Sequence, residues 1–468
     1  METTGHHAMR LSPDALSDLA DALKNEFGDR ASDSLGVRGH YSEDEAYHRA
    51  FPDLVVIPHN TAEVSRVVTL CAAYECPITA WGAGTSLEGN ALAVFGGVCL
   101  DLSQMNRILE VQAEDLTVTV EAGVTRNQLN TDLRDTGLFF PIDPGADATL
   151  GGMAATRASG TNAVKYGTMR GNVVCCTAVL ADGTIIRTGG RSPKSAAGYD
   201  LTALLVGSEG TLGIITELTV RLHPVPDRST AMICVFETIT SAVQTVILAI
   251  QCGIDVARIE LLDEKMMAAI NVFEKANYSE APTLFVEFHG SNIVVEAHTQ
   301  AFLEIVESLG GRQVAIATAT EERSRLWKAR HNALYAARAL VPGKKVLITD
   351  VCVPISRLAD CITEARAEID LSQLTATIAG HVGDGNFHAF ILVDPSNKAE
   401  IAAAEALHHN LAKRAIAMSG TCTGEHGIGL GKRELLLEEA GAAVAAMRAV
   451  KYSLDPLGLL NPGKIFLD

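Results

Sequence analysis

The stretch Pro77-Ile-Thr-Ala-Trp-Gly82-Ala-Gly84-Thr-Ser-Leu-Glu-Gly89-Asn90 combines a short predicted strand with a glycine-rich loop. Glycines let backbone N–H groups approach a phosphate closely, and the Thr-Ser pair adds hydroxyl donors. The spacing of Gly82, Gly84 and Gly89 is not that of a dinucleotide-binding fingerprint, and no amphipathic helix follows the loop. The stretch therefore argues against a Rossmann domain. It fits either a phosphate-binding loop of another fold or a plain connector.

Further loops rich in small residues follow along the chain, at residues 143–162, 166–172, 194–200 and 206–216. Small residues at this density do not build a hydrophobic core by themselves. We therefore expect a channel in which an extended cofactor lies against the backbone.

Helices and strands alternate around these loops. Asn60 and Glu63 have the spacing of a capping box, and apolar residues continue after them at helical intervals. Strands are predicted at residues 77–81, 98–102, 116–121, 173–180 and 184–188, and helices at 11–30, from 61 on, and at 127–135.

The segment His223-Pro-Val-Pro226 marks a candidate domain boundary, because its two prolines interrupt regular structure. A chain of 468 residues is too long for one core, so two or three domains are expected. Beyond the boundary, strands are predicted at residues 232–236, 258–262 and 283–288, and helices at 242–252, 263–273, 294–309 and 321–338. The predicted fold class is α+β.

Two segments near the C-terminus are predicted to form one site. The first, Ile378-Ala-Gly-His381-Val-Gly-Asp-Gly-Asn-Phe-His388, has apolar residues on both sides of an Asp-Gly turn, which is typical of a β-hairpin. The second, Gly-Glu425-His426-Gly, adds a carboxylate. The set His381, His388 and Glu425 suits a divalent transition metal with open coordination positions. The alternative is that these are ordinary polar residues in glycine-rich loops.

The composition is that of a soluble globular protein, with 47% hydrophobic and 20% charged residues. The formal net charge of −18 argues against nucleic acid and against an anionic membrane surface. Residues 1–10 lack the apolar run of a secretory signal, and no apolar run reaches the length of a membrane span. The ten cysteines have no framework spacing, so we expect reduced core thiols.

The ordered set of motifs resembles the FAD-binding domain of the vanillyl-alcohol-oxidase superfamily of FAD-linked oxidases. It is carried by residues 81–90, 144–162, 166–174 and 207–216. A closer resemblance, to metal-dependent D-lactate dehydrogenases of the cytochrome-linked type, runs from about residue 35 to residue 464. Its motifs include PGADATLGGMAAT at 144–156, KSAAGY at 194–199, VGSEGTLG at 206–213, TDVCVPISRL at 349–358, GHVGDGNFH at 380–388 and GTCTGEHGIG at 420–429.

This resemblance implies a two-subdomain FAD-binding (PCMH-type) domain and a cap domain with a mixed antiparallel sheet and covering helices. We expect an N-terminal helical segment at 1–50, the FAD-binding domain at 51–226, the cap with the metal site at 227–449, and a returning tail at 450–468. Relatives with covalent flavin carry a histidine near Thr85, so we expect non-covalent FAD.

The resemblance also implies where the FAD lies. The diphosphate is expected on the loop 82–89 and the turn 151–152, the adenine end near residues 209 and 213–214, and the closing tail beside the flavin. The implied FAD-binding residues are Gly82, Ala83, Gly84, Thr85, Ser86, Gly89, Asn90, Pro144, Gly145, Thr149, Gly151, Gly152, Ala158, Ser159, Gly160, Tyr166, Val174, Glu209, Gly213, Ile214 and Asn461.

For the chemistry, the resemblance implies that Arg330 binds a substrate carboxylate, as the bidentate guanidinium geometry allows. A metal (Zn or Mn) on His381, His388 and Glu425 would lower the pKa of the substrate hydroxyl. His426 is expected to take the hydroxyl proton, and the hydride passes from the α-carbon to flavin N5. A third metal ligand or a packing histidine is the alternative for His426.

The expected substrate is a D-2-hydroxy acid. Relatives that oxidise D-2-hydroxyglutarate carry a lysine and an asparagine where this chain has Ile348 and Phe390. Because an unpaired distal charge near apolar groups is costly, we expect D-lactate or another acid with an apolar side chain. Glycolate stays open.

Three other functions are compatible with these residues. The rivals are a zinc hydrolase, a flavin-binding accessory subunit and an oxidase that passes electrons to O₂. The expected partners are an electron acceptor (cytochrome c, a quinone or an electron-transfer flavoprotein) and a second copy in a homodimer. The expected location is the bacterial cytoplasm, with peripheral contact to a membrane as an option, or the mitochondrion in a eukaryote.

Overall fold

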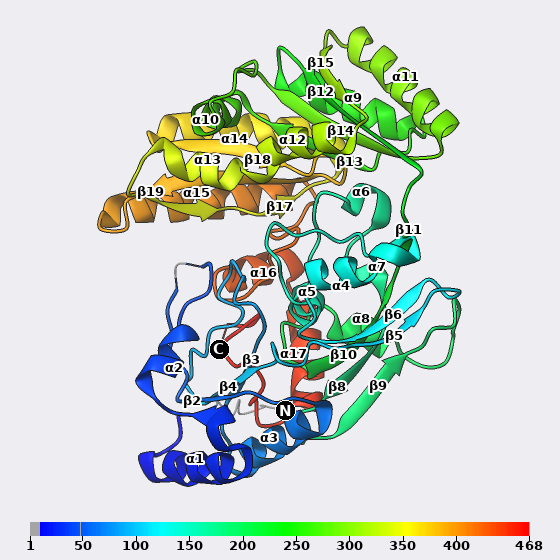
Figure 1. Cartoon of the computed structure of the whole chain (residues 1–468). Helices are drawn as coiled ribbons and strands as arrows, with labels where there is room; N and C mark the ends of the chain where they lie inside the picture. The colour runs from blue at the N-terminus through cyan, green and yellow to red at the C-terminus, as the bar shows by residue number, and fades with distance from the viewer. Residues whose placement is uncertain (1–9, 47, 468) are drawn as a thin grey trace. The chain divides into compact units, whose positions relative to one another are not determined.

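The computed structural model describes residues 10–46 and 48–467, and the chain forms two compact units (Figure 1). Unit 1 comprises Met1–Ala158, Thr168–Pro224 and Glu425–Asp468, and unit 2 comprises Ser159–Gly167 and Val225–Gly424. The prediction made for residues 1–10 falls, except for residue 10, outside the described residues.

The first sheet of unit 1 has the strand order β1-β2-β4-β3, in which β2, β3 and β4 are parallel and β1 is antiparallel. Apolar side chains of α1 and α3 pack into the core around these strands. Asn60 caps α3 and accepts the N–H of Glu63, as the capping box predicts. The elements are α1 (Pro13–Phe27), η1 (Gly28–Arg30), β1 (Ala31–Ser32), α2 (Leu35–His40), β2 (Leu54–Val56), α3 (Thr61–Ala73), β3 (Ile78–Trp81) and β4 (Val98–Asp101).

The second sheet of unit 1 is antiparallel, with the strand order β5-β6-β10-β8-β9. It covers a second core, to which the helix α5 contributes. The elements are β5 (Ile108–Gln112), β6 (Thr117–Glu121), α4 (Arg126–Asp132), η2 (Arg134–Thr136), β7 (Leu138–Phe139), α5 (Leu150–Thr156), α7 (Met169–Asn172), β8 (Val173–Val179), β9 (Ile185–Gly189), α8 (Leu201–Leu205), β10 (Ile214–Arg221), β11 (His223–Pro224), α16 (Arg433–Ala440) and α17 (Ala443–Leu454).

Unit 2 is built on one antiparallel sheet with the strand order β15-β12-β14-β13-β18-β19-β16, and β17 pairs with β19. Helices α10, α12 and α13 cover one face, and α14 and α15 pack against the other beside β19. The elements are α6 (Ala163–Tyr166), β12 (Arg228–Val235), α9 (Ile239–Gln251), β13 (Arg258–Leu262), α10 (Glu264–Glu274), β14 (Thr283–Gly290), α11 (Asn292–Ser308), β15 (Arg312–Ala317), α12 (Thr320–His331), α13 (Ala333–Leu340), β16 (Lys345–Ile348), β17 (Val351–Cys352), η3 (Ile355–Arg357), α14 (Leu358–Ser372), β18 (Ala376–Gly380), β19 (Asn386–Val393) and α15 (Lys398–Ala417).

Mixed helix and sheet confirm the predicted α+β class. The predicted hairpin is present: β18 and β19 pair antiparallel, and Gly385 has the positive φ of 85° that its tight turn requires. A Cβ on Gly385 would lie 2.0 Å from the carbonyl oxygen of Val353. Only glycine fits there.

Three expectations differ from the structure. The single helix expected at 321–338 is two helices, α12 and α13, which meet at Asn332. Residues 425–449, expected in the cap, belong to unit 1, and the N-terminal helix α1 packs into a unit 1 core. The cysteines are free thiols in the described chain, but Cys252 is exposed and Cys352 half-buried, so the prediction of ten core thiols is wrong for these two. None of the described helices is both long and apolar enough to cross a membrane.

Candidate functional site

A buried glutamate joins two of the predicted site residues in unit 2. Glu260 lies on β13 with no exposed surface, and its Oε2 accepts a hydrogen bond from Arg330 Nε at 2.8 Å and lies 2.7 Å from Nη2 in an ion pair. Its Oε1 lies 2.6 Å from His381 Nδ1. Burial raises the pKa of Glu260, but the charges and hydrogen bonds of His381 and Arg330 outweigh burial, so the pKa is lowered. The carboxyl is therefore ionised at neutral pH.

The partners of the two histidines fix their tautomers. An ionised carboxylate only accepts, so His381 donates Nδ1–H to Glu260. His388 donates Nδ1–H to the Thr349 carbonyl at 2.9 Å, for the same reason. In both neutral rings, Nε2 is then the nitrogen that carries the lone pair, which is the form that binds a metal. The ring centroids are 5.5 Å apart, and the ligand nitrogens lie within 4.8 Å of each other.

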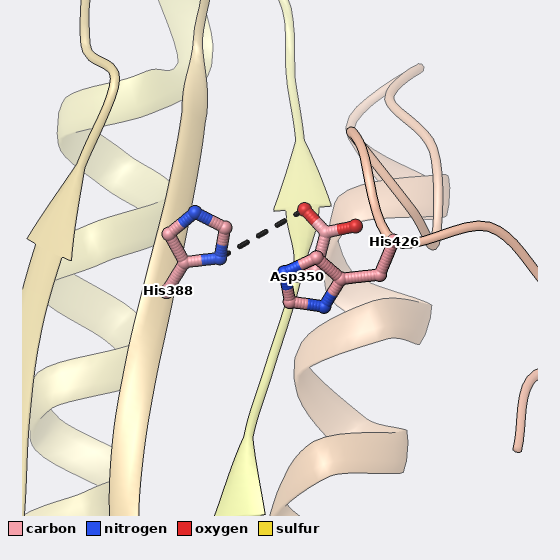
Figure 2. A group of neighbouring side chains, drawn as sticks. All are labelled: Asp350, His388 and His426. Atoms are coloured by element: carbon pink, nitrogen blue, oxygen red, sulfur yellow. Dashed lines mark ion pairs between the residues drawn. The ribbon is translucent and has the colours of Figure 1, made fainter. Parts of the chain in front are cut away.

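Asp350 supports the same region from the start of the loop after β16. Its Oδ1 lies 3.9 Å from His388 Nδ1, a contact that Figure 2 marks with a dashed line and that is an ion pair only when the ring is protonated. The same oxygen accepts a hydrogen bond from Asn386 Nδ2 at 2.8 Å. Its Oδ2 accepts from Thr423 Oγ1 at 2.7 Å. A Cβ on Gly424 would lie 2.1 Å from Asn386 Nδ2, so this backbone packs tightly on the same group. The hydrogen bonds of Asp350 thus connect Thr423 to β19, the strand that carries His388.

Glu425 is the next residue and the first of the returning segment of unit 1. Its Cα lies about 3.8 Å from that of Gly424, because a trans peptide joins them. The predicted metal ligand Glu425 is therefore bonded directly to Gly424, the last residue of unit 2.

The wall beside His388 is apolar. Phe390 lies two residues along β19, on the same face as His388, and its ring centroid is 6.4 Å from that of His388. Ile348 on β16 is the directly paired residue opposite Phe390. Both pack into the core under α10, α12 and α13.

Tyr166 belongs to unit 2 and forms a chain of hydrogen bonds there. Its hydroxyl lies 2.9 Å from His289 Nδ1, and His289 Nε2 lies 2.6 Å from Glu287 Oε1 on β14. Trp327 donates its indole N–H to the other oxygen of Glu287. Burial raises the pKa of Tyr166 to about 12, so the phenol stays protonated.

In unit 1 the predicted phosphate loop and the predicted turn are in contact. A Cβ on Gly82 would lie 2.3 Å from Thr149 Oγ1, and one on Gly151 would lie 2.6 Å from the Cβ of Ala122. Thr149 caps α5 by accepting the N–H of Gly152. Gly84 and Gly89 have positive φ values of 68° and 73°. These close approaches require glycine, as a backbone cradle for an extended anionic cofactor does.

Glu209 and Asn461 organise the other side of this cradle. Glu209 accepts hydrogen bonds from Asn90 Nδ2 at 2.7 Å and from the N–H groups of Ile428 and Gly429 at 2.7 and 2.9 Å. Asn461 donates to the carbonyls of Asn90 and Glu209 at 2.8 and 2.7 Å. Burial raises the pKa of Glu209, although these hydrogen bonds oppose the shift.

His426 lies in the loop that Glu209 holds. Its Nδ1 is 3.8 Å from Glu88 Oε1, and the same oxygen is 2.9 Å from the buried Nζ of Lys432. Glu88 comes from the glycine-rich loop that opened the sequence analysis. A predicted base therefore has a carboxylate beside its ring.

With the geometry of both units described, the comparisons with known proteins decide the family. Residues 225–465 match the family described as FAD linked oxidases, C-terminal domain, and residues 52–189 match the FAD binding domain. The chain is a member of the FAD-linked oxidases. Its cofactor is FAD.

This FAD-linked oxidase is similar to several curated proteins. It is 51% identical, over 96% of its length and 92% of the relative, to a probable mitochondrial D-lactate dehydrogenase of Danio rerio. It is 45% identical to the mitochondrial D-lactate dehydrogenase [cytochrome] of Arabidopsis thaliana, over 91% of its length and 76% of the relative. A glycolate oxidase subunit of Bacillus subtilis is 38% identical over 93% of both chains.

Solved structures confirm the expected fold. A 4-ethylphenol oxidase from Gulosibacter chungangensis covers 97% of this FAD-linked oxidase, and 98% of that chain is covered, with a TM-score of 0.81 and 17% identity. p-Cresol methylhydroxylase gives a TM-score of 0.80 at 18% identity, with 98% and 99% covered. At this identity the likeness concerns the fold alone.

The other predicted FAD residues of this FAD-linked oxidase are distributed over both units. Ala158 ends the first segment of unit 1, whereas Ser159 and Gly160 begin the short segment of unit 2. The rest lie in unit 1: Ala83, Thr85 and Ser86 in the glycine-rich loop, Pro144 and Gly145 before α5, Val174 on β8, and Gly213 and Ile214 at the start of β10. Their contact with FAD stays a prediction.

Sequence reasoning missed Glu260, Asp350 and Glu88 as members of the site. Glu260 stood in a predicted strand, Arg-Ile-Glu-Leu-Leu, as an acid among apolar residues. A carboxylate in an apolar strand is a usable signal, because buried acids are rarely unpaired. Its partners could not be named, because they lie 70 and 121 residues away.

Proposed function

We propose that this FAD-linked oxidase is an FAD- and metal-dependent dehydrogenase that oxidises a D-2-hydroxy acid, most readily D-lactate, to the 2-oxo acid. One observation carries the proposal: Glu260 binds a metal-type histidine, His381, through one oxygen and the guanidinium of Arg330 through the other. A carboxylate binder and a metal ligand are thereby held side by side. D-lactate dehydrogenases among the relatives support the choice of substrate.

Arg330 binds the substrate carboxylate in this proposal. Its side chain is 11% exposed, and its contacts with Glu260 use Nε, through a hydrogen bond, and Nη2, through an ion pair. The guanidinium has five N–H donors in a planar fork, so donors on the Nη1 side are oriented by the bonds to Glu260. Charge-assisted bonds of this kind are directional, and they orient the acid as well as bind it.

The proposed metal ligands are His381, His388 and Glu425. The two histidines fit a metal, because each donates Nδ1–H and keeps its lone pair on Nε2. Two imidazoles and one carboxylate suit zinc or manganese. When bound, the metal supplies a Lewis acid that lowers the pKa of the substrate hydroxyl.

His426 accepts the hydroxyl proton in this proposal. An imidazole has a reference pKa close to working pH, which suits a general base. The carboxylate of Glu88, 3.8 Å from Nδ1, favours the protonated ring that results. We expect His426→Asn to retain flavin and metal and to lose most turnover. Near-normal turnover in that variant would reject the assignment.

FAD, when bound, accepts the hydride that leaves the α-carbon. We propose that the flavin is held without a covalent bond, because Thr85 stands where relatives with covalent flavin carry a histidine. Acid precipitation should then leave the yellow colour in the supernatant. A yellow protein pellet would contradict this part of the proposal.

The apolar pair Ile348 and Phe390 supports a small, uncharged substrate side chain. A second carboxylate beside this pair would lose hydration without gaining a partner. D-2-hydroxyglutarate is thereby disfavoured. Glycolate is the second candidate, because the B. subtilis relative is named a glycolate oxidase subunit.

The acceptor of the electrons is proposed to be a cytochrome, as the name of the Arabidopsis relative indicates. The formal charge of −18 supports a basic protein partner. A quinone or an electron-transfer flavoprotein are the alternatives. A mitochondrial location in a eukaryote, by the same relatives, and a homodimer complete the proposal.

An anaerobic flavin-bleaching assay tests the proposed reaction. D-lactate, L-lactate, glycolate and D-2-hydroxyglutarate are added separately to the purified yellow protein without an acceptor. D-lactate is expected to bleach the flavin fastest. A zinc hydrolase would show no flavin, an accessory subunit would show no bleaching with any acid, and an oxidase would recolour rapidly in air; each of these results overturns the proposal.

A further inference from the structure

The carboxylate of Glu260 is divided between two partners that have different tasks. Oε1 lies 2.6 Å from His381 Nδ1, and Oε2 accepts a hydrogen bond from Arg330 Nε at 2.8 Å and forms an ion pair with Nη2 at 2.7 Å. These partners come from the end of β18 and from the last turn of α12. Glu260 itself lies in the middle of β13, the strand paired with β18, and therefore has a fixed backbone.

We infer that Glu260 is a positioning residue shared by the two halves of the site: it sets His381 as a metal ligand and Arg330 as the clamp for the substrate carboxylate. The inference rests on the proposed function. It goes beyond it by assigning one residue control over both metal affinity and substrate binding.

The burial of Glu260 makes this control effective. The residue has no exposed surface, and the side chain of His381 is only 10% exposed, so little water competes for these bonds. A buried carboxylate that loses its partners is costly, which favours the arrangement in which both are bound. The three groups therefore hold one another in a single geometry.

The contact with Glu260 has a different effect on His381 and on Arg330. For His381, the bond at Nδ1 selects the tautomer whose Nε2 can bind a metal, and the carboxylate makes that nitrogen more basic. For Arg330, the hydrogen bond at Nε and the ion-pair contact at Nη2 both go to Oε2, which holds the guanidinium in place and leaves Nη1 for the substrate carboxylate.

A glutamine at position 260 cannot serve both partners. Its one carbonyl oxygen can accept from His381 or from Arg330, and its NH₂ group then faces the N–H donors of the other. If the NH₂ faces His381, the ring must place its proton on Nε2, which weakens metal binding. If it faces Arg330, the clamp is displaced.

The test measures two quantities on the FAD-loaded enzyme and on Glu260→Gln. The first is Zn²⁺ affinity in the absence of substrate, by competition with a chromophoric chelator, and the second is KM and kcat for D-lactate. We expect Zn²⁺ affinity to fall about 10- to 100-fold, as for other residues that orient metal-bound histidines, or KM to rise to a similar extent.

Asp263→Asn is the matched control. Asp263 is also a buried carboxylate, follows directly after β13, and accepts hydrogen bonds from Arg366 and from the N–H of Met266, not from His381 or Arg330. The same exchange of acid for amide there should leave Zn²⁺ affinity and KM close to wild type. Equal losses in both variants would indicate general loosening of the sheet and overturn the inference.

The outcomes separate the inference from the proposed function. Wild type that binds no Zn²⁺ and is not bleached by D-lactate overturns the proposed function. Wild type that binds Zn²⁺, together with a yellow Glu260→Gln whose Zn²⁺ affinity and KM are both unchanged, overturns the inference alone. If Glu260→Gln does not retain flavin, Glu260→Asp decides by the same two readouts: it keeps the charge but is one carbon too short to reach both partners.

Discussion

The carboxylate of Glu209 accepts the backbone N–H of Ile428 at 2.7 Å and thereby holds the loop that carries Glu425 and His426. The neighbouring N–H of Gly429 binds the other oxygen at 2.9 Å. A Cβ on Gly427 would lie 2.8 Å from Glu209 Oε1, so the loop fits closely over the carboxylate. The expected metal ligand and base are thus placed by an acid more than 200 residues earlier, since the bond to Ile428 spans 219 residues.

We predict that Glu209→Gln lowers turnover at least about 10-fold while FAD stays bound. Glutamine has one acceptor oxygen, so one of the loop N–H groups loses its partner, at a cost of about 1–3 kcal/mol. The measurements are kcat with D-lactate and the flavin content of the purified variant. Glu217→Gln is the control, because Glu217 accepts from Thr177 on the neighbouring strand β8. Normal turnover in Glu209→Gln would show that this loop does not depend on Glu209.

Lys464 gives a prediction for the pH dependence of stability. Burial lowers the pKa of Lys464 to about 7. The carboxylates of Glu209 and Asp44 raise this pKa, and the positive charge of Arg433 lowers it further. An unfolded lysine titrates at about 10.4, so between these values the unfolded chain binds a proton that the folded chain lacks. The contribution of Lys464 to the free energy of unfolding therefore rises as the pH rises from about 7 to about 10.4.

The comparison is between wild type and Lys464→Met in thermal unfolding at about pH 6.5, 8 and 9.5. A shift of about three units corresponds to about 4 kcal/mol, so the difference in stability between the two proteins should change in favour of wild type as pH rises. A difference that is constant, or that moves the other way, would contradict the buried, deprotonated lysine.

The double substitution Ile348→Lys with Phe390→Asn should change the choice of substrate. The two residues are directly paired across β16 and β19, so the new polar groups can meet a distal carboxylate together. We expect kcat/KM for D-2-hydroxyglutarate to rise about 10-fold relative to that for D-lactate, since a charge-assisted hydrogen bond contributes about 1.5–3 kcal/mol.

Leu347→Lys controls for the added charge, because Leu347 lies on the same strand with its side chain on the opposite face. An unchanged ratio of the two specificity constants in the double variant would show that the pair does not line the space for the substrate side chain.

Gly82→Ala tests the cradle for FAD. The φ of Gly82 is one that alanine can adopt, so the obstacle is space: the new Cβ would lie 2.3 Å from Thr149 Oγ1. We expect Thr149 to be displaced from the N-terminus of α5 and the flavin-to-protein absorbance ratio to fall. Gly36→Ala on α2 is the control, because no atom lies within 4 Å of its Cβ position. If Gly82→Ala keeps its full flavin content, FAD binding does not depend on the contact between Gly82 and Thr149.

The features that the sequence predicted correctly are local. Asn60 caps a helix through Glu63, and the turn at Gly385 joins two strands with His381 and His388 beside it. Each of these depends on residues within about ten positions of one another, where turn and capping chemistry decide the conformation. The family resemblance supplied the superfamily, which the matching domains and solved structures confirm.

The features that the sequence could not supply depend on distant contacts. Glu260 was part of a predicted strand, but only the folded sheet shows that His381 and Arg330 bind its two oxygens. Glu209 was expected near adenine, and its bonds to the loop at 428–429 were not foreseen. The break between α12 and α13 at Asn332 was also missed. In the folded unit the side chain of Asn332 donates to Glu274 Oε1 at 2.8 Å, a contact with a residue 58 positions earlier.

The most direct test of the central claim is the rate at which D-lactate bleaches the flavin before and after removal of metal. The enzyme is treated with a strong chelator, dialysed, and assayed anaerobically, and Zn²⁺ or Mn²⁺ is then restored. We predict that the flavin spectrum survives chelation, that bleaching slows by at least about 100-fold, and that restored metal returns the rate. Unchanged bleaching in protein shown to be free of metal would contradict a metal-assisted oxidation at His381, His388 and Glu425.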